Sequence, residues 1–249
     1  MTHTGQIPIL TIVEHDLRQI KLPPLIRPDV PNDKPDEKLV VWGVTYYANC
    51  VIAHMQTVLS GLVQLLEAKN IPTALIIGRH VFEWTAHICY MSRNTETYLR
   101  KKEWGRAWHL HSLAMEGNIW IRLHGSKYAP PVLTEGTPEP IGIANVVACY
   151  DEYLRQVGKK ADAKDTYGLL SEHSHPNSAC FNRYCSYVGR EVRFVAPSAD
   201  ASLLGEERYL IDLLLMLDQL LKLGREKVVR RQIVAILTRI AELAKERHK

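Results

Sequence analysis

The sequence has few cysteines, and they do not form the pattern of a disulfide-bonded secreted domain. Its five cysteines stand far apart, at positions 50, 89, 149, 180 and 185. An odd, scattered set excludes an even disulfide framework and is typical of buried thiols in a reducing compartment. The first residues also lack the basic segment and the cleavage site of a signal peptide. We therefore expect a cytoplasmic protein.

The sequence also has little excess charge and few long apolar runs. We find no window that approaches the roughly 18 to 20 uncharged apolar residues of a membrane span, so we expect a soluble protein with no membrane partner. The formal net charge of +4 in 249 residues is only mildly basic. It permits nucleic acid as a partner but does not by itself indicate one. Phosphate-binding loops, dinucleotide fingerprints and Gly-x-Ser-x-Gly motifs are missing, so we predict no cofactor.

Apolar residues recur with a helical period along most of the chain, and an apolar content of 46% is ample for a core. We predict an all-α bundle of about six or seven helices that forms a single domain over residues 38–249. The expected helices cover residues 38–70, 73–94, 95–125 and 143–158, followed by a short helix that ends at or just before Pro176. The periodic segment 202–249 forms either two helices or one helix interrupted at Gly224.

Two segments depart from this helical pattern. Residues 1–37 include PPLIRPDVPNDKP, whose five prolines remove backbone donors and fix φ. We predict that they form an extended arm on the surface or on a partner. Alternation around a glycine suggests a small β-hairpin near residues 184–195. The arm and the amphipathic C-terminal helices together favour a homodimer.

Three polar residues interrupt the most apolar predicted helix. Arg79, Glu83 and His87 are spaced i, i+4 and i+8, which brings them onto one face with about 40° of drift per step. A charge taken into a protein interior costs several kcal/mol unless it is paired and hydrogen-bonded. This polar stripe therefore needs partners from another part of the chain.

The segment YGLLSEHSHPNSACFNRYC can supply such partners, because Tyr167, Ser171 and His175 repeat the same spacing. Two hypotheses follow. The residues can form a buried structural network that fixes the register of the helices. Alternatively they form a catalytic site, in which His175 is the general acid or base, Glu83 orients it, and Arg79 binds an anion such as phosphate.

These motifs carry a resemblance to a known group of proteins. Arg79-x-x-x-Glu83 in an apolar helix, followed by Tyr167-x-x-Leu-Ser171-x-x-x-His175-Pro, resembles an uncharacterised family of bacterial all-helical proteins that is loosely HEPN-like. The resemblance covers roughly residues 40–220. It implies a helical bundle, often dimeric, and a relation to metal-independent ribonucleases of toxin–antitoxin and phage-defence systems. Those enzymes use an Arg-x(4–6)-His motif.

On this resemblance the expected ligands are RNA or a nucleotide, and the expected protein partner is an antitoxin or a related protein. The catalytic candidates are His175, Glu83, Arg79, Tyr167 and Ser171, with Arg79 and His87 as ligand-binding candidates. The sequence has one Arg-x(4)-His match, from Arg106 to His111. The alternative to an enzyme is a non-enzymatic helical module that binds a small ligand or a partner protein.

A metal site is a competing interpretation of the same segment. His173, His175, Cys180 and Cys185 are zinc ligands in kind, but the two cysteines are not spaced as a zinc knuckle. We therefore predict no metal. Cys50 and His54 are spaced i, i+4 and resemble a nucleophile with its base, although thiols on apolar helices are usually inert. The tryptophans, His109 and His111 of residues 95–125 can stack on bases or fill the core.

Overall fold

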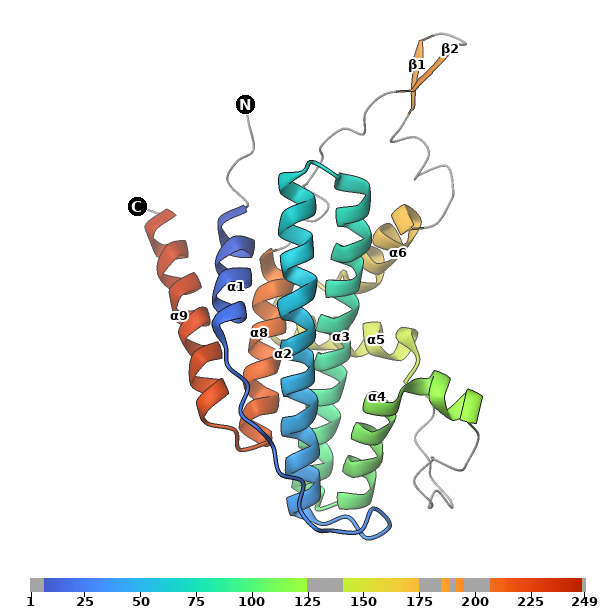
Figure 1. Cartoon of the computed structure of the whole chain (residues 1–249). Coiled ribbons are helices and arrows are strands. Elements are labelled where there is room, and N and C mark those ends of the chain that lie inside the picture. Colours follow the sequence, from blue (N-terminus) through green and yellow to red (C-terminus); the bar gives the residue numbers. More distant parts are fainter. Residues whose placement is uncertain (1–6, 125–140, 175–184, 189–190, 195–206, 248–249) are drawn as a thin grey trace.

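The structure is a computed structural model, and it describes residues 7–124, 141–174, 185–188, 191–194 and 207–247. Eight helices lie within these described residues, and the two longest, α2 and α3, run antiparallel through the centre of an all-α bundle (Figure 1). The helices are α1 (Ile7–Gln19), α2 (Glu37–Glu67), α3 (Ile71–Lys101), α4 (Trp104–His124), α5 (Ile143–Gln156), α6 (Ala163–Ser174), α8 (Glu207–Leu223) and α9 (Val228–Arg247).

Two short strands accompany the helices. β1 (Cys185–Val188) and β2 (Glu191–Phe194) pair antiparallel, with Ser186 opposite Arg193. They lie within the range 184–195, where the sequence suggests a hairpin. The rest of the described chain consists of helices and their connections.

Capping residues fix where the two central helices begin. The side chain of Asp36 accepts a hydrogen bond from the backbone N–H of Leu39 at 2.9 Å, which satisfies one free donor at the start of α2. Asn70 caps α3 by accepting from the N–H of Thr73, and Pro72 occupies the first turn, where no N–H is needed. The predicted boundary near Asn70 is therefore confirmed.

The predicted boundary between residues 94 and 95 is wrong. Helix α3 continues without a break to Lys101, and Lys102 ends it in the left-handed conformation with φ of 58°. Helix α4 then begins at Trp104. The segment from Thr95 to Lys101 contains no helix-breaking residue, so its charged side chains mark an exposed face and not a helix end.

The extended conformation predicted for the whole N-terminal arm is also wrong, because residues 7–19 form helix α1. This segment has no proline after Pro8, and Val13 and Leu17 are completely buried. Proline is tolerated in a first helical turn, so Pro8 does not prevent the helix. The prolines that exclude helix begin at position 23, and residues 20–36 contain no helix.

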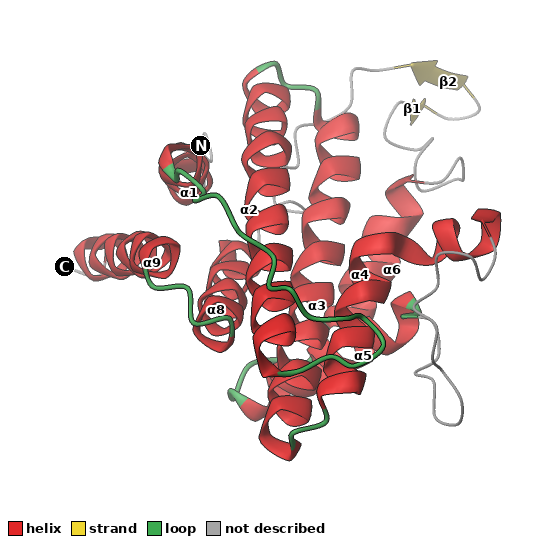
Figure 2. Ribbon diagram, turned by 60° about the horizontal axis from the view of Figure 1, so that its bottom comes forward, coloured by secondary structure: helices red, strands yellow, loops and turns green. Residues whose placement is uncertain are grey.

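Residues 20–36 run along the bundle from α1 toward α4 and back to α2 (Figure 2). The side-chain amide of Gln56 on α2 donates to the carbonyl oxygens of Leu17 and Ile20, at 2.8 and 3.1 Å. The guanidinium of Arg27 lies over the rings of Trp42 on α2 and Trp108 on α4, 5.8 and 5.9 Å from their centroids. Carbonyl bonds and cation–π contacts therefore hold this segment against the helices.

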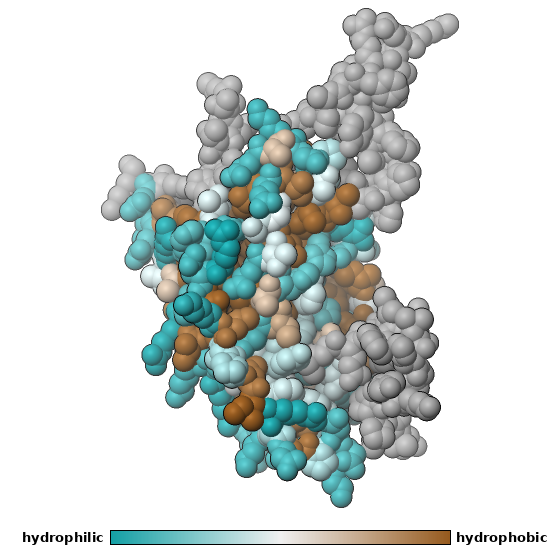
Figure 3. Space-filling model, viewed as in Figure 1, coloured by the Kyte–Doolittle hydropathy of each residue, from teal (hydrophilic) through white to brown (hydrophobic). Residues whose placement is uncertain are grey.

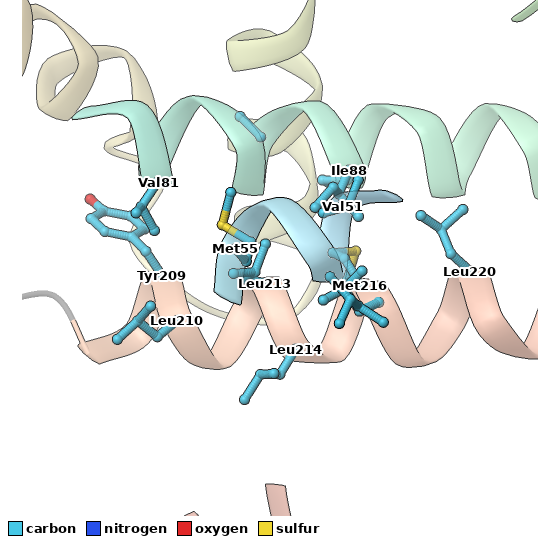
Figure 4. Packing of buried hydrophobic residues seen from close by; sticks show 14 of the residues in the cluster. Val51, Met55, Val81, Ile88, Tyr209, Leu210, Leu213, Leu214, Met216 and Leu220 are labelled. Atoms are coloured by element: carbon cyan, nitrogen blue, oxygen red, sulfur yellow. The ribbon is translucent and has the colours of Figure 1, made fainter. Parts of the chain in front are cut away.

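The core forms where α8 packs against α2 and α3. In Figure 4, Met55 of α2 lies next to Leu213 of α8, and Val81 of α3 lies next to Tyr209 of α8. Val51, Ile88 and Leu220 belong to the same buried cluster. A fully buried aliphatic side chain contributes roughly 1.5–3 kcal/mol relative to an exposed one. This shared core explains why residues far apart in the sequence form one bundle.

A carboxylate lies inside this apolar bundle. Asp212 on α8 is completely buried and accepts hydrogen bonds from the hydroxyl of Tyr150 at 2.8 Å and from Nζ of Lys159 at 2.6 Å. These two donors offset the cost of burying the charge. The same carboxylate and the surrounding burial raise the pKa of Tyr150 well above its ordinary value. The contacts join α5 and the segment after it to α8.

One helix has the length and composition of a membrane span, which corrects the expectation that none would. Helix α2 carries no charged residue between Leu39 and Leu66, and its most apolar window has a mean hydropathy of 1.3. A single such helix is weak evidence, because the core helix of a soluble protein has the same composition. The face of the bundle shown in Figure 3 carries apolar patches separated by hydrophilic side chains.

The C-terminal segment forms two helices, α8 and α9, which is one of the two alternatives expected from the sequence. The turn between these helices lies close to α2. The hydroxyl of Thr45 donates to the carbonyl oxygen of Gly224 at 2.8 Å. A β-carbon at position 224 would lie 3.1 Å from the backbone N and 3.2 Å from the Cα of Thr45. Only glycine fits this approach without moving the turn.

Replacement of Gly224 by alanine is therefore expected to lower the free energy of unfolding by about 1–3 kcal/mol, a typical cost of overpacking. Gly61 is the matched control, because it lies within α2 and a β-carbon there meets nothing within 4 Å. Gly61→Ala should be neutral or stabilise by up to about 1 kcal/mol. Urea denaturation of both variants measures the difference. Equal stabilities would show that the turn adjusts freely.

Candidate functional site

Arg79 connects α3 to α6. Its Nε donates to Oε1 of Glu83, one helical turn further along α3, at 2.8 Å. Its Nη2 donates to the hydroxyl of Tyr167 on α6 at 3.2 Å, and the guanidinium lies 5.3 Å from the centroid of the Tyr167 ring. The structure thus brings together three of the residues that the sequence proposes as a site.

The exposure of this ion pair is intermediate. The side chains of Arg79 and Glu83 are 21% and 29% exposed, so the pair is shielded from bulk water but remains accessible. Burial alone would lower the pKa of Arg79, but the hydrogen bond and the charge of Glu83 outweigh it and raise this pKa. Among the described residues, Nη1 of Arg79 has no hydrogen-bond partner. Within the described part of the chain, this nitrogen is therefore left for a ligand.

The other candidates on and after α6 are only partly described. The hydroxyl oxygen of Ser171 is buried and has no hydrogen-bond partner among the described residues. Helix α6 ends at Ser174, as the proline rule predicts. His175 and Cys180 lie outside the described residues, and the side chains of His173 and Cys185 are not among those described. Their roles therefore stay predictions.

His87 faces α2, not Arg79. Its Nδ1 forms a hydrogen bond of 2.7 Å with the hydroxyl of Tyr47. Burial lowers the pKa of His87 to about 4, so the imidazole is neutral at pH 7. The drift of about 40° per i+4 step explains why the third member of the stripe contacts a different helix.

A pair of histidines between α2 and α3 was not predicted as part of the site. Nε2 of His54 and Nε2 of His80 lie 2.7 Å apart, and the indole N–H of Trp84 donates to the same nitrogen of His80 at 3.0 Å. The two imidazole rings meet edge to face, with centroids 5.0 Å apart. His54 appeared in the sequence as a possible base for Cys50, but its hydrogen bond goes to His80. A partner on another helix cannot be found from spacing along one helix.

Glu83 connects this histidine pair to Arg79. It follows His80 by three residues and Arg79 by four, and side chains at both spacings are neighbours on a helix. Burial lowers the pKa of His80, the nearby His54 lowers it further, and the charge of Glu83 acts in the opposite direction. The charge of this one carboxylate therefore acts to raise the pKa of Arg79 and that of His80.

The Arg-x(4)-His match does not form an accessible site. His111 is completely buried, and its Nε2 forms a 2.9 Å hydrogen bond with the hydroxyl of Thr95. Arg106 lies at the surface and pairs with Glu103 at 3.2 Å. A ribonuclease site of the usual HEPN spacing would need both side chains at one accessible point.

Metal ligands do not gather in the described part of the chain. No group of three or more His, Cys, Asp or Glu residues there is arranged to hold a metal ion. Cys50 is exposed, while Cys89 is buried and Cys149 partly buried. The zinc hypothesis for His173, His175, Cys180 and Cys185 stays a prediction, because the side chains of these four residues are not described.

Comparisons with known proteins give no relative from which a function could be transferred. No family model matches the chain, no curated protein matches it, and no solved structure matches it. The function must therefore be inferred from the side chains themselves.

Acid is expected to lower the free energy of unfolding, because protonation of a buried histidine places an unpaired charge in the core. Burial lowers the pKa of His87 to about 4 and that of His111 to about 3. Both values lie below the ordinary value near 6.5, so the folded state binds fewer protons than the unfolded state. The stabilisation is complete above pH 6.5 and decreases as the pH falls toward 4 and 3, by about 1.4 kcal/mol per pH unit for each histidine.

Denaturation with urea at pH 7 and pH 5 measures this effect, and we expect a decrease of about 2–4 kcal/mol. His111→Asn should weaken the pH dependence, because asparagine keeps a polar group beside Thr95 and does not titrate. The exposed His15 provides the control, since its replacement by glutamine should leave the pH dependence unchanged. Stability that is constant between the two pH values would refute the assignment.

Proposed function

We propose that this chain is a HEPN-like helical protein of a bacterial defence or toxin–antitoxin type. In this proposal it acts on RNA or a nucleotide by metal-independent acid and base chemistry. Arg79 binds the phosphate, and His175 is the general acid or base. Glu83, Tyr167 and Ser171 complete the site. An antitoxin or related partner protein and a homodimer belong to the same proposal.

The observation that carries the proposal is the position of the Arg79 guanidinium between two helices. Glu83 and Tyr167 hold it by Nε and Nη2, while Nη1 has no partner among the described residues. Arginine binds phosphate well because its planar N–H groups match the phosphate oxygens, and a fixed guanidinium loses little entropy on binding. A partly exposed, oriented arginine is thus suited to hold an anionic group.

Phosphoester chemistry needs a proton acceptor or donor beside such an anion holder. Imidazole is the side chain whose ordinary pKa best suits that role near neutral pH. His175 follows the last residue of α6, the helix that carries Tyr167 and Ser171. The buried hydroxyl of Ser171, which has no partner among the described residues, supports a polar site at this helix.

The alternative is a non-enzymatic helical module that binds a small ligand or a partner protein, with a purely structural polar cluster. It is favoured by the ion pair of Arg79 with Glu83 at 2.8 Å, which balances the charge of the guanidinium without any ligand. In that case Arg79 maintains the contact between α3 and α6. Its removal would cost stability, since Glu83 would be left without its partner.

The two functions differ in the expected effect of His175→Ala. If the chain is a nuclease, this variant should lose at least a hundredfold of the cleavage rate of a single-stranded RNA oligonucleotide, a typical loss for an acid or base group. Its melting temperature should change by no more than a few degrees. His15→Ala is the matched control, because His15 is exposed on α1 and should leave the rate unchanged.

RNA cleavage by the purified protein, with and without a chelator, provides the measurement, and growth after induced expression provides a second one. Loss of folding in His175→Ala would support the structural alternative. Absence of cleavage and of growth inhibition in the wild-type protein would contradict the nuclease.

A further inference from the structure

Among the described residues, the Arg79 site carries no net positive charge. Glu83 balances the guanidinium through the 2.8 Å hydrogen bond, and Tyr167 contributes a neutral hydroxyl. A phosphate group placed at Nη1 of Arg79 would bring a second negative charge close to the carboxylate of Glu83. Since like charges in a half-buried site repel strongly, binding becomes favourable when another positive charge forms nearby.

The His54–His80 pair can provide that charge. It is linked to the site through Glu83, which is a neighbour of Arg79 at i+4 and of His80 at i+3 on α3. Both imidazoles are half-buried, whereas His111 on the neighbouring helix is fully buried. The pair is thus partly accessible to solvent, and the charge of Glu83 already acts on His80.

The hydrogen bonds of the pair define where its protons lie. The indole nitrogen of Trp84 can only donate, so Nε2 of His80 is an acceptor. Nε2 of His54 then donates to the same atom and shares its single lone pair with the indole N–H, and in the neutral pair the proton of His80 is on Nδ1. The lone pair that lies outside this contact is on Nδ1 of His54. A proton added there converts His54 to an imidazolium whose Nε2–H strengthens the bond to His80.

We propose that binding of a phosphodiester at Arg79 is coupled to the uptake of one proton by the His54–His80 pair. The inference rests on the proposed function, because it assumes that Arg79 binds phosphate. By linkage the reciprocal effect is obligatory: an anion that promotes protonation binds more tightly when the pair is already protonated. In the bound state two negative groups, Glu83 and the phosphate, are balanced by two positive groups, Arg79 and the protonated pair. In the free state Glu83 alone is balanced by Arg79 alone.

Other groups around the pair do not explain a pH dependence near neutrality. Those on described elements are Glu83, Arg79 and His87 on α3, Cys50 and Tyr47 on α2, and Tyr167 on α6. Arg79 stays charged throughout this range, and the pKa of Tyr47 is raised far above it by burial. The pKa of His87 is lowered to about 4. Among the groups on described elements, the two hydrogen-bonded imidazoles are therefore the ones that we assign to the proton uptake.

The test uses the deoxydinucleotide d(ApA), whose single phosphodiester keeps one charge from pH 5.5 to 7.5 and has no 2′-hydroxyl to permit cleavage. Calorimetric titration of the full chain should show binding that is about tenfold tighter at pH 5.5 than at pH 7.5, the ratio expected when one site titrates between these values. Repetition in buffers with different heats of ionisation should reveal a net uptake that averages about half a proton per d(ApA) over this pH range, as a tenfold change over two pH units requires.

Variants separate this inference from the proposed function. His54→Asn and His80→Asn should bind d(ApA) with the same affinity at both pH values, while Arg79→Gln should not bind. Binding by the wild-type protein that is independent of pH and takes up no proton would overturn the coupling and leave the phosphate site intact. Absence of wild-type binding at both pH values would overturn the phosphate site and the coupling together.

A measurement on the wild-type protein alone covers the case in which the histidine variants fail to fold. The imidazole resonances of His54 and His80 should titrate at higher pH when d(ApA) is bound, while those of the exposed His15 should not move. An unchanged titration of both paired histidines in the complex would also overturn the coupling.

Discussion

Burial of the polar side chains of helix α3 is the constraint on which the rest of the structure depends. This helix packs against α2, α4, α5, α6 and α8, so few of its faces are open to water. A polar group in such a position must find a partner, because an unsatisfied buried donor or acceptor costs about 1–3 kcal/mol. Thr85 and Thr95 are completely buried, and each has its hydroxyl in a hydrogen bond.

The same constraint distributes the remaining polar residues of α3 among its neighbours. Arg79 and Glu83 pair with each other and reach Tyr167 on α6, while His80 and His87 turn to His54 and Tyr47 on α2. The fully buried hydrogen bond of Thr95 with His111 joins α3 to α4. The contacts at Arg79 and His80 are only partly buried, and on this difference in exposure we base the proposal that they form a ligand site and not a purely structural network.

Much of the bundle could be predicted from local signals. Caps and proline positions locate the start of α2 and α3 and the end of α6, and Gly224 marks the break between α8 and α9. Helix α1 was missed because the proline count of the whole arm outweighed a short amphipathic segment. The end of α3 was misplaced because its last two turns are charged, although charge alone does not end a helix.

The site was predictable only in part, for a physical reason. The spacing of Arg79 and Glu83 follows from helical geometry, so their ion pair could be derived from the sequence. The contact of Arg79 with Tyr167 was expected only as one of several possible partners. The His54–His80 pair could not be found in this way, because the register between two antiparallel helices depends on how their whole surfaces pack.

The most direct test of the central claim, that Arg79 is a ligand-binding group, is a titration of inorganic phosphate and of a nucleoside 3′-monophosphate at constant pH. Wild-type protein and Arg79→Lys should be compared, because lysine keeps the charge but cannot hold Glu83, Tyr167 and a phosphate at once. The account predicts at least tenfold weaker binding by the variant, with a melting temperature within a few degrees of the wild type. Equal affinities, or a variant that loses its fold while the wild-type protein binds neither ligand, would contradict it and identify Arg79 as a structural residue.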